Sequence, residues 1–481
     1  MRIAMLSYRS KPHCGGQGIY LRHLSRELVA LGHEVEVFSG QPYPELDEGV
    51  RLTKVPSLDL YREPDPFRVP HLREFRDRID VEEFATMCVA GFPEPKTFSS
   101  RVARLLRERA ADFDIAHDNQ VLGYGMLDIE QQLPLITTLH HPITFDRRID
   151  IAQTRNPWRK FTLSRWYGFL RMQGRVARAA RHIMTPSETS KRDIAADFGV
   201  DPARMQVILL GVDDGFVPPS LPRVPGRILA MASADAPMKG IATLLEAFAK
   251  LRTERDVELL LVTKPKPGGR TEKLIDKLSI GDAVRFVHGI SDAELVALMG
   301  SAEVACVPSF YEGFSLPTAE LMACATPLIV SRAGAIPEVF MTAFDAAVLQ
   351  MGLDVGEILL VHAVGSGVGT AAVQMAKALG AVTVGPSRTP DKLERAVELG
   401  LDHPVAGNED WPERVLEVTV GRGADVILDL VGGPYLGGNQ RVVAPGGRHI
   451  VVGVPGGAVT QIDLRALMSR RVTLRGTVLR A

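Results

Sequence analysis

The sequence is poor in the features that mark secreted, membrane-spanning or nucleic-acid-binding proteins. It has only four cysteines in 481 residues and no CxxC pair, so neither a disulfide framework nor a cysteine metal site is expected. No stretch reaches the roughly 18 apolar residues that a membrane-spanning helix needs, and the first apolar run is too short for a signal peptide. The 56 Lys and Arg nearly balance the 57 Asp and Glu, and a net charge of -1 argues against nucleic acid as a partner. We therefore expect a cytoplasmic protein, with peripheral contact at the inner membrane surface left open.

The sequence does contain three successive patterns of an apolar strand, a turn and a helix. Apolar residues make up 46% and charged residues 23%, as in globular proteins, and 481 residues suffice for about three domains. The three leading strands are expected at residues 2–7, 227–231 and 358–363. These patterns predict an α/β fold of three Rossmann-like domains with parallel sheets, bounded at residues 1–215, 216–339 and 340–481. Within the first domain, the proline-rich region 41–100 is expected to be an irregular insertion.

The second domain carries two carboxylates eight residues apart, Glu312 and Glu320, across a loop that opens a helix. Side chains in this arrangement can face one ligand, or can serve only as charges at a helix start. The segment from Ser309 to Glu320 resembles the E-x7-E element of glycosyltransferase family 4, the retaining GT-B enzymes. Further segments match that family in order along residues 1–339: Gly15–Tyr20, Asp118–Gln120, Thr138–Pro142, Thr185–Ser190, Gly211–Asp213 and Met238–Gly240.

This resemblance implies a hexosyltransferase that takes a sugar from a UDP- or GDP-linked donor, without a metal, and passes it to an acceptor that the sequence does not identify. Lys239 would meet the donor diphosphate, Glu320 the ribose hydroxyls and Glu312 the transferred sugar. The other implied site residues are Gly313, Phe314 and Ser315 through their backbone, His140 from the first domain, and Gly16 at the first helix. The alternatives of a hydrogen-bonded strand-end histidine and a plain glycine turn stay open.

The sequence departs from that family just before the lysine. The family carries an arginine there, whereas this chain has Ala232–Asp235, so Lys264 or Lys266 would have to neutralise part of the donor charge.

The first domain contains a basic and aromatic stretch at residues 151–187, with eight Lys and Arg and no acid. Such a stretch can rest on anionic lipid headgroups, which would place a lipid-linked acceptor nearby, or it can form an ordinary solvated helix face.

The third domain has a glycine loop between its leading strand and helix, at Val364–Gly369. Together with Val361–Ala363 before it and Ala371–Lys377 after it, this loop resembles the nucleotide-binding domain of zinc-independent quinone oxidoreductases in the medium-chain dehydrogenase superfamily. The cofactor residues that the resemblance implies are Gly365, Ser366, Gly367, Val368 and Gly369. No acid ends the second strand, where Ser387, Arg388 and Lys392 suit a 2′-phosphate, so NADPH is expected rather than NADH.

The change of resemblance falls at Ala335–Val339, a pentapeptide that is ordinary in both families. We interpret the chain as a chimera spliced there, with a shortened donor domain whose sheet edge is either exposed or paired with the third unit. The dehydrogenase part would lack its substrate domain and its last elements. The leading hypothesis is a glycosyltransferase with an appended NADPH-binding module. The alternatives are an NADPH-dependent quinone reductase or zinc-free alcohol dehydrogenase-like fragment, and an inactive nucleotide-binding fusion.

Overall fold

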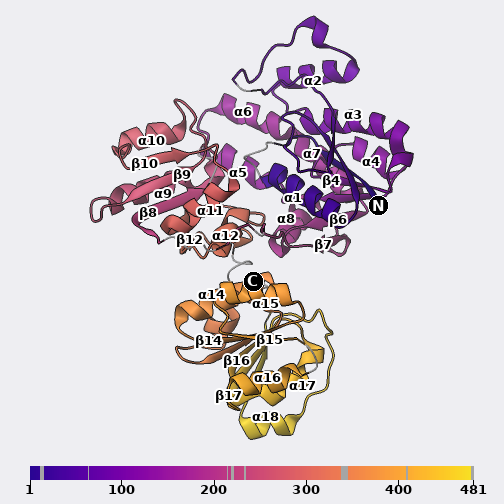
Figure 1. Ribbon diagram of the computed structural model, residues 1–481. Helices are drawn as coiled ribbons and strands as arrows, with labels where there is room; N and C mark the ends of the chain where they lie inside the picture. The colour runs from indigo at the N-terminus through magenta and orange to yellow at the C-terminus, as the bar shows by residue number, and fades with distance from the viewer. Residues whose placement is uncertain are drawn as a thin grey trace.

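The computed structural model describes the whole chain except residues 11–15, 63, 214, 218–221, 232–234, 337–344, 408–409 and 478–481. Its described part forms three α/β units, each built on its own sheet of parallel strands. Figure 1 shows the first two units side by side and the third beyond them, joined near α14 and α15. The predicted fold class is confirmed.

The first unit has a seven-stranded sheet in the order β3-β2-β1-β4-β5-β6-β7. Its strands are β1 Arg2–Ser7, β2 Glu34–Ser39, β3 Arg51–Lys54, β4 Ile115–Asn119, β5 Leu135–Thr138, β6 His182–Thr185 and β7 Met205–Val207. Its helices are α1 Gly16–Ala30, α2 Arg78–Cys88, α3 Glu94–Arg109, α4 Gly125–Glu130, α5 Thr144–Gln153, α6 Pro157–Trp166, α7 Leu170–Ala179 and α8 Glu188–Phe198. The central strands are buried almost throughout, as expected for a sheet covered on both faces.

The expectation of an irregular insertion at 41–100 holds for much of 41–77 but was wrong for the rest of the region. This region supplies the edge strand β3 and helices α2 and α3. Helix α2 begins where Asp77 accepts hydrogen bonds from the backbone N–H groups of Ile79 and Asp80. Arg101 of α3 then pairs with the buried carboxylates of Asp80 and Glu83. The polar composition of this region concealed a packed pair of helices held by a buried ion-pair network.

The second unit has five strands in the order β10-β9-β8-β11-β12. They are β8 Val224–Met231, β9 Glu258–Val262, β10 Val284–Val287, β11 Ala302–Val307 and β12 Leu328–Val330, with helices α9 Ile241–Leu251, α10 Arg270–Leu278, α11 Asp292–Ser301 and α12 Leu316–Ala323. In the described part of the chain, β12 pairs only with β11. Ile329 on this edge is 63% exposed. Of the two predicted outcomes, the described residues show an exposed sheet edge rather than an edge paired with the third unit.

The third unit has six strands in the order β15-β14-β13-β16-β17-β18. They are β13 Ile358–Val361, β14 Val382–Ser387, β15 His403–Ala406, β16 Ala424–Asp429, β17 Val443–Val451 and β18 Thr473–Gly476. The helices are α14 Gly367–Leu379, α15 Pro390–Glu398, α16 Trp411–Val418, α17 Gly433–Val442 and α18 Leu464–Arg470, preceded by a π-helical turn at Asp345–Gln350.

The first buried residues after the predicted join pack in the hydrophobic core of the third unit. Ala346, Ala347 and Met351 are buried in one hydrophobic cluster with Leu359 of β13. The predicted boundary at 339/340 itself lies outside the described residues. In all three sheets the strand order reverses beside the first strand of the unit, and such reversal points are where ligands of these sheets bind, at the carboxyl ends of the strands.

Candidate functional site

The predicted lysine and the first predicted carboxylate meet at the carboxyl edge of the second sheet. Lys239 lies in a 3-10 turn after β8, and its Nζ donates a 2.8 Å hydrogen bond to Oε1 of Glu312, which follows β11. The hydroxyl of Ser309 donates to the same oxygen at 2.6 Å. The turn lies so close to β11 that a Cβ on Gly240, at φ +67, would stand 2.0 Å from the Pro308 carbonyl oxygen. Glycine is therefore required there to hold Lys239 at this edge.

The second predicted carboxylate, Glu320 on α12, has no such partner. It is 8% exposed, and no hydrogen bond to its carboxylate occurs within the described ranges of the chain. Burial, with smaller contributions from the charges of Asp292 and Asp213, raises the pKa of Glu320 to about 7. An unpaired buried carboxylate with a raised pKa is typical of a binding site whose hydrogen-bond donors come from a ligand.

The loop between these two carboxylates contacts the first unit. The Gly313 carbonyl accepts hydrogen bonds from the hydroxyls of Ser187, at 2.7 Å, and Ser190, at 3.0 Å. An added Cβ at Gly313 would lie 2.8 Å from the His140 carbonyl oxygen, so a larger residue would push the two units apart. Ser315 adopts φ +79, an unusual backbone conformation for serine, as it leads into α12.

An aromatic contact beside this loop also joins the two units. Tyr311 stacks on Phe145 of α5 with ring centroids 4.2 Å apart. Its hydroxyl donates a 2.7 Å hydrogen bond to Asp193 of α8. These contacts, like Ser187 and Ser190, were missed as site residues in the sequence. The sequence signal for Ser187, Ser190 and Tyr311 was their place in the segments Thr185–Ser190 and Ser309–Glu320, which match the family.

His140 is held as a neutral imidazole at the end of β5. Its Nε2 donates to the amide oxygen of Asn119 at 2.8 Å, and its backbone N–H donates to Gln120 at 2.6 Å. Burial lowers the pKa of His140 to about 3, with smaller contributions from His141 and His117. The imidazole therefore keeps Nδ1 free of a proton near neutral pH and able to accept a hydrogen bond.

The other predicted donor residues are placed but not brought into contact with this centre. Gly16 opens α1 with free space where a side chain would stand, while Gly15 lies outside the described residues. Lys264 and Lys266 follow β9 at the same sheet edge as Lys239. Asp235 instead accepts a hydrogen bond from the N–H of Thr271 at the start of α10. The Ala232–Ala234 stretch lies outside the described residues.

The basic stretch at 151–187 is partly used for packing. Arg165, Arg175 and Arg178 hydrogen-bond to Val89, Tyr124 and Phe198. On α6, Trp158 and Phe161 stay exposed and stack with ring centroids 5.5 Å apart. Contact with a membrane through this stretch stays a prediction. No helix in the described ranges is both long and apolar enough to cross a bilayer.

The third unit presents its predicted dinucleotide loop at the carboxyl end of β13. Ser366 caps α14 by accepting the N–H of Gly369, and a Cβ on Gly369 would stand 2.6 Å from the Ala363 carbonyl. Lys392 of α15 lies against Gly365, where a Cβ would be 2.6 Å from the lysine Cβ. Ser387 ends β14 without an acid beside it. A glycine loop at a helix start with a lysine side chain against it fits the phosphates of a dinucleotide.

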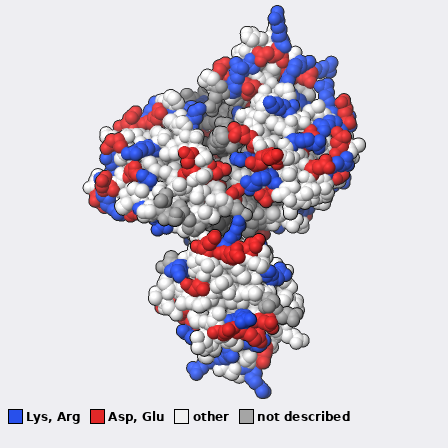
Figure 2. All heavy atoms as spheres, viewed as in Figure 1, with Lys and Arg blue, Asp and Glu red and all other residues white. Residues whose placement is uncertain are grey.

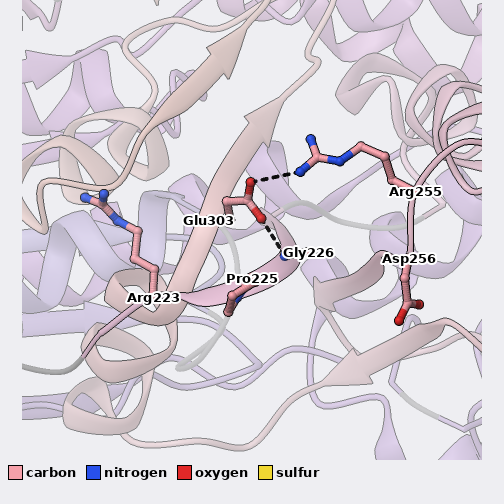
Figure 3. A pocket seen from close by; sticks show the side chains of 6 residues that line it. All are labelled: Arg223, Pro225, Gly226, Arg255, Asp256 and Glu303. Carbon is pink, nitrogen blue, oxygen red and sulfur yellow. Dashed lines mark hydrogen bonds and ion pairs between the residues drawn. The ribbon is translucent and has the colours of Figure 1, made fainter.

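Two hollows accompany these sites. A cavity of about 380 Å³ is enclosed jointly by the glycine loop, α14 and α15 of the third unit and by α12 and the 209–217 segment of the other two. A shallower hollow of about 500 Å³ lies at the amino ends of β8 and β11 (Figure 3). There Glu303 accepts the N–H of Gly226 and pairs with Arg255, so its charges are already satisfied. That hollow lies at the sheet edge opposite Lys239 and Glu312. Among the described residues no cluster of His, Cys, Asp and Glu is arranged to hold a metal.

Two Rossmann-like units that close on a lysine and two carboxylates define a GT-B glycosyltransferase. Residues 14–216 match the family model Glycosyltransferase Family 4, residues 218–357 match Glycosyl transferases group 1, and residues 367–481 match Zinc-binding dehydrogenase. The chain belongs to glycosyltransferase family 4 and continues into a dehydrogenase-type nucleotide-binding domain. The predicted fusion of two families is confirmed, and the matches change from one family to the other between 357 and 367.

Particular relatives agree with this assignment. The chain is 59% identical over 363 residues to "MMP alpha-(1->4)-mannosyltransferase" of Mycolicibacterium hassiacum, an alignment that covers 75% of this chain and 88% of the relative. It is 28% identical over 358 residues to a glycogen synthase of Mycobacterium tuberculosis, covering 70% of this chain and 80% of the relative. The solved sucrose-phosphate synthase of Thermosynechococcus elongatus shares the fold at a TM-score of 0.53 and 21% identity, covering 87% of this chain and 97% of that one.

Proposed function

We propose that the first two units transfer mannose from a nucleotide-linked donor to a sugar hydroxyl, forming an alpha-(1->4) linkage with retention. The 59% identity to a mannosyltransferase over three quarters of the chain supports the sugar and the linkage. The single structural observation behind the proposal is the centre of Lys239, Glu312 and the unpaired Glu320 at the carboxyl edge of the second sheet. GDP and UDP are the two candidate nucleotides of the donor.

The proposed roles follow from the charge each group carries. Lys239 neutralises the departing diphosphate, since a compact ammonium suits a phosphate oxygen. The unpaired Glu320 accepts hydrogen bonds from the ribose hydroxyls. Glu312, oriented by Lys239 and Ser309, contacts the transferred sugar together with the backbone of Gly313–Ser315. His140 accepts a hydrogen bond from a sugar hydroxyl at Nδ1. Rate enhancement then comes from fixed charges placed where the leaving group develops negative charge.

Donor transfer can be tested on the purified full chain with GDP-mannose and UDP-glucose, using an alpha-linked manno-oligosaccharide as acceptor. We expect release of nucleoside diphosphate from GDP-mannose and a product that an alpha-mannosidase digests. Glu320→Ala should lower kcat/KM at least 100-fold, because the ribose hydroxyls lose a charged acceptor. Ala293→Ser, on an exposed position of α11, is the control. Turnover that survives Glu320→Ala would contradict the assignment, and turnover of UDP-glucose alone would contradict mannose as the donor sugar.

The raised pKa of Glu320 gives donor binding a pH dependence. In the free protein this pKa is about 7, and hydroxyl groups that donate to the carboxylate favour its charged form and lower the pKa in the complex. Donor affinity should therefore rise as the pH increases to 7 and level off above it, by up to about tenfold per pH unit. Calorimetric titration with GDP-mannose between pH 5.5 and 8.5 measures this slope. Glu320→Gln, which cannot ionise, should give a flat profile, and an equal slope in that variant would contradict the role.

We also propose that the third unit binds NADP(H). Gly365, Ser366, Gly367, Val368 and Gly369 would meet the pyrophosphate, and Ser387, Arg388 and Lys392 the 2′-phosphate. Bound NADPH would supply hydride chemistry. Quinone reduction by this part of the chain stays an alternative, as does a fusion that binds nucleotides without turnover.

A further inference from the structure

The 380 Å³ cavity is lined by residues of all three units. Its floor is the third unit, with Gly365 and Ser366 of the loop and Lys392 of α15. Its roof consists of α12 together with residues 209–213 and 216–217, between the sheets of the first two units. Figure 1 shows α14 and α15 at the end of the third unit that faces the other two. The volume is in the range of small-ligand sites.

The two ends of the cavity differ in chemistry. The floor offers a helix start at α14 and the ammonium group of Lys392, both of which favour a phosphate. The roof is mainly apolar, since Leu209, Phe216 and Met322 line the hollow, and Leu209 is 60% exposed. Its charged residue, Asp213, pairs with Arg26 of the first unit. A phosphate end and an apolar end together suit a nucleotide.

Acidic groups also stand near this cavity. Figure 2 shows acidic side chains gathered where the third unit meets the others, at α15. The sequence of α15 places Asp391, Glu394 and Glu398 on it, and Glu398 lines the cavity. At a rise of 1.5 Å per residue Glu398 lies about 9 Å along the helix from Lys392. Arg395, one turn along α15 from Lys392, also lines the cavity, so a phosphate is favoured beside these two cations, whereas Glu398 can accept a hydrogen bond from a hydroxyl or amide N–H.

Helix α12 connects this cavity to the donor centre. Ala319, Met322 and Ala323 line the cavity from one helix face, at the spacing of neighbouring turns. Glu320, between them in sequence, is buried and projects from the flank of this face, about 100° around the helix axis from Ala319. Met322 also packs on the hydrophobic core of the third unit. The position of α12 therefore depends on both what fills the cavity and what binds Glu320.

We infer that the glycosyltransferase units form the second wall of the dinucleotide site, and that NADP(H) and the nucleotide sugar consequently strengthen each other's binding through α12. The inference rests on the proposed donor and NADP(H) sites. A dinucleotide in the cavity fills the open side of α12 and holds Glu320 in place, so α12 loses less conformational freedom when the donor binds. By linkage, the donor must tighten the dinucleotide by the same factor.

The shared wall is tested by calorimetric titration of the full chain with NADP⁺ alone. Lys392→Ala should weaken NADP⁺ at least tenfold and leave NAD⁺ nearly unchanged. Ala323→Trp fills the cavity from the glycosyltransferase side and should weaken NADP⁺ binding by a similar factor. Ala293→Trp, at an exposed position of α11, should leave NADP⁺ binding unchanged. Leu209→Glu, at an exposed position, repeats the test should Ala323→Trp fail to fold. Unchanged NADP⁺ affinity in the folded wall variants would overturn the inference.

The coupling is tested by titrating GDP-mannose with and without saturating NADP⁺. We expect about fivefold tighter binding in its presence, and Lys392→Ala should remove this gain. Equal or weaker donor binding in the presence of NADP⁺ would overturn the coupling. If GDP-mannose and UDP-glucose both fail to bind, the proposed transferase function fails, while the NADP⁺ titrations still decide whether the wall is shared.

Discussion

Replacing Lys239 with methionine is expected to lower kcat/KM for the sugar donor by about 10²- to 10³-fold, the usual loss when one fixed group that stabilises developing charge is removed. Methionine keeps much of the lysine stem but cannot neutralise a diphosphate. Most of the loss should appear in kcat, because the leaving group gains its charge in the transition state. The measurement is steady-state release of nucleoside diphosphate over a range of donor concentrations.

The Lys239 variant also leaves a carboxylate without its cationic partner. Glu312 is 8% exposed, and Ser309 would be its remaining hydrogen-bond donor among the contacts described above. An uncompensated buried charge destabilises a protein by a few kcal/mol, so part of the lost rate could reflect unfolding. The double variant Lys239→Met/Glu312→Gln removes both charges and should restore the melting temperature without restoring turnover. Recovery of turnover in the double variant would show that Lys239 acts only as a structural partner of Glu312.

Lys239, Glu312 and Glu320 were named as site residues because their motifs resemble those of glycosyltransferase family 4, and the structure brings Lys239 and Glu312 into contact. The sequence did not reveal that Glu312 is paired and Glu320 is not, since pairing depends on the turn at Gly240 that brings Lys239 to the edge of β11. The contacts of Tyr311 with Phe145 and Asp193 were likewise hidden, because they join segments more than a hundred residues apart. Neither could the cavity be predicted, since three units enclose it.

The region 41–100 shows the opposite failure, in which composition was misleading. Proline and charged residues there predicted an irregular segment, but the charges of Arg101, Asp80 and Glu83 face each other inside a helix pair. A buried ion pair has the same composition as a solvated surface, and only the three-dimensional partner distinguishes them.

The third unit should be the part of the chain most sensitive to acid. His362 is fully buried, its Nε2 donates to the amide oxygen of Asn439, and its Nδ1 has no hydrogen-bond partner among the described residues. Burial lowers the pKa of His362 to about 4, against about 6.5 in an unfolded chain. Because the folded pKa is the lower one, protonation of His362 leaves the free energy of unfolding unchanged above pH 6.5 and lowers it as the pH falls toward 4. The loss amounts to about 3 kcal/mol at pH 4, or roughly 10 °C in melting temperature.

The first two units contain groups that act in opposite directions over the same pH range. Burial lowers the pKa of His117 to about 4 and that of His140 to about 3, so both destabilise the fold on acidification. Burial raises the pKa of Asp118 and of Glu320 to about 7 each, and these groups stabilise the folded state as they become protonated. The two sets offset each other in part. In the third unit burial acts against ionisation of Asp429, but hydrogen bonds from His449 and the backbone outweigh it and lower the pKa of Asp429, so this group stays charged and does not offset His362 between pH 7 and pH 4.

The three tryptophans of the chain allow the units to be followed separately. Trp411 lies with its ring centroid 4.9 Å from that of His362, so a Trp158→Phe/Trp166→Phe chain reports on the third unit. We expect the melting temperature seen through Trp411 to fall by roughly 10 °C between pH 7 and pH 4. That seen through Trp166, in a Trp158→Phe/Trp411→Phe chain, should fall by less. Adding His362→Gln should lower the Trp411 transition at pH 7 but flatten its pH dependence, because glutamine can still donate to Asn439 and cannot take up the proton. An unchanged slope in that variant would show that another group, rather than the unpartnered nitrogen of His362, makes the third unit acid-labile.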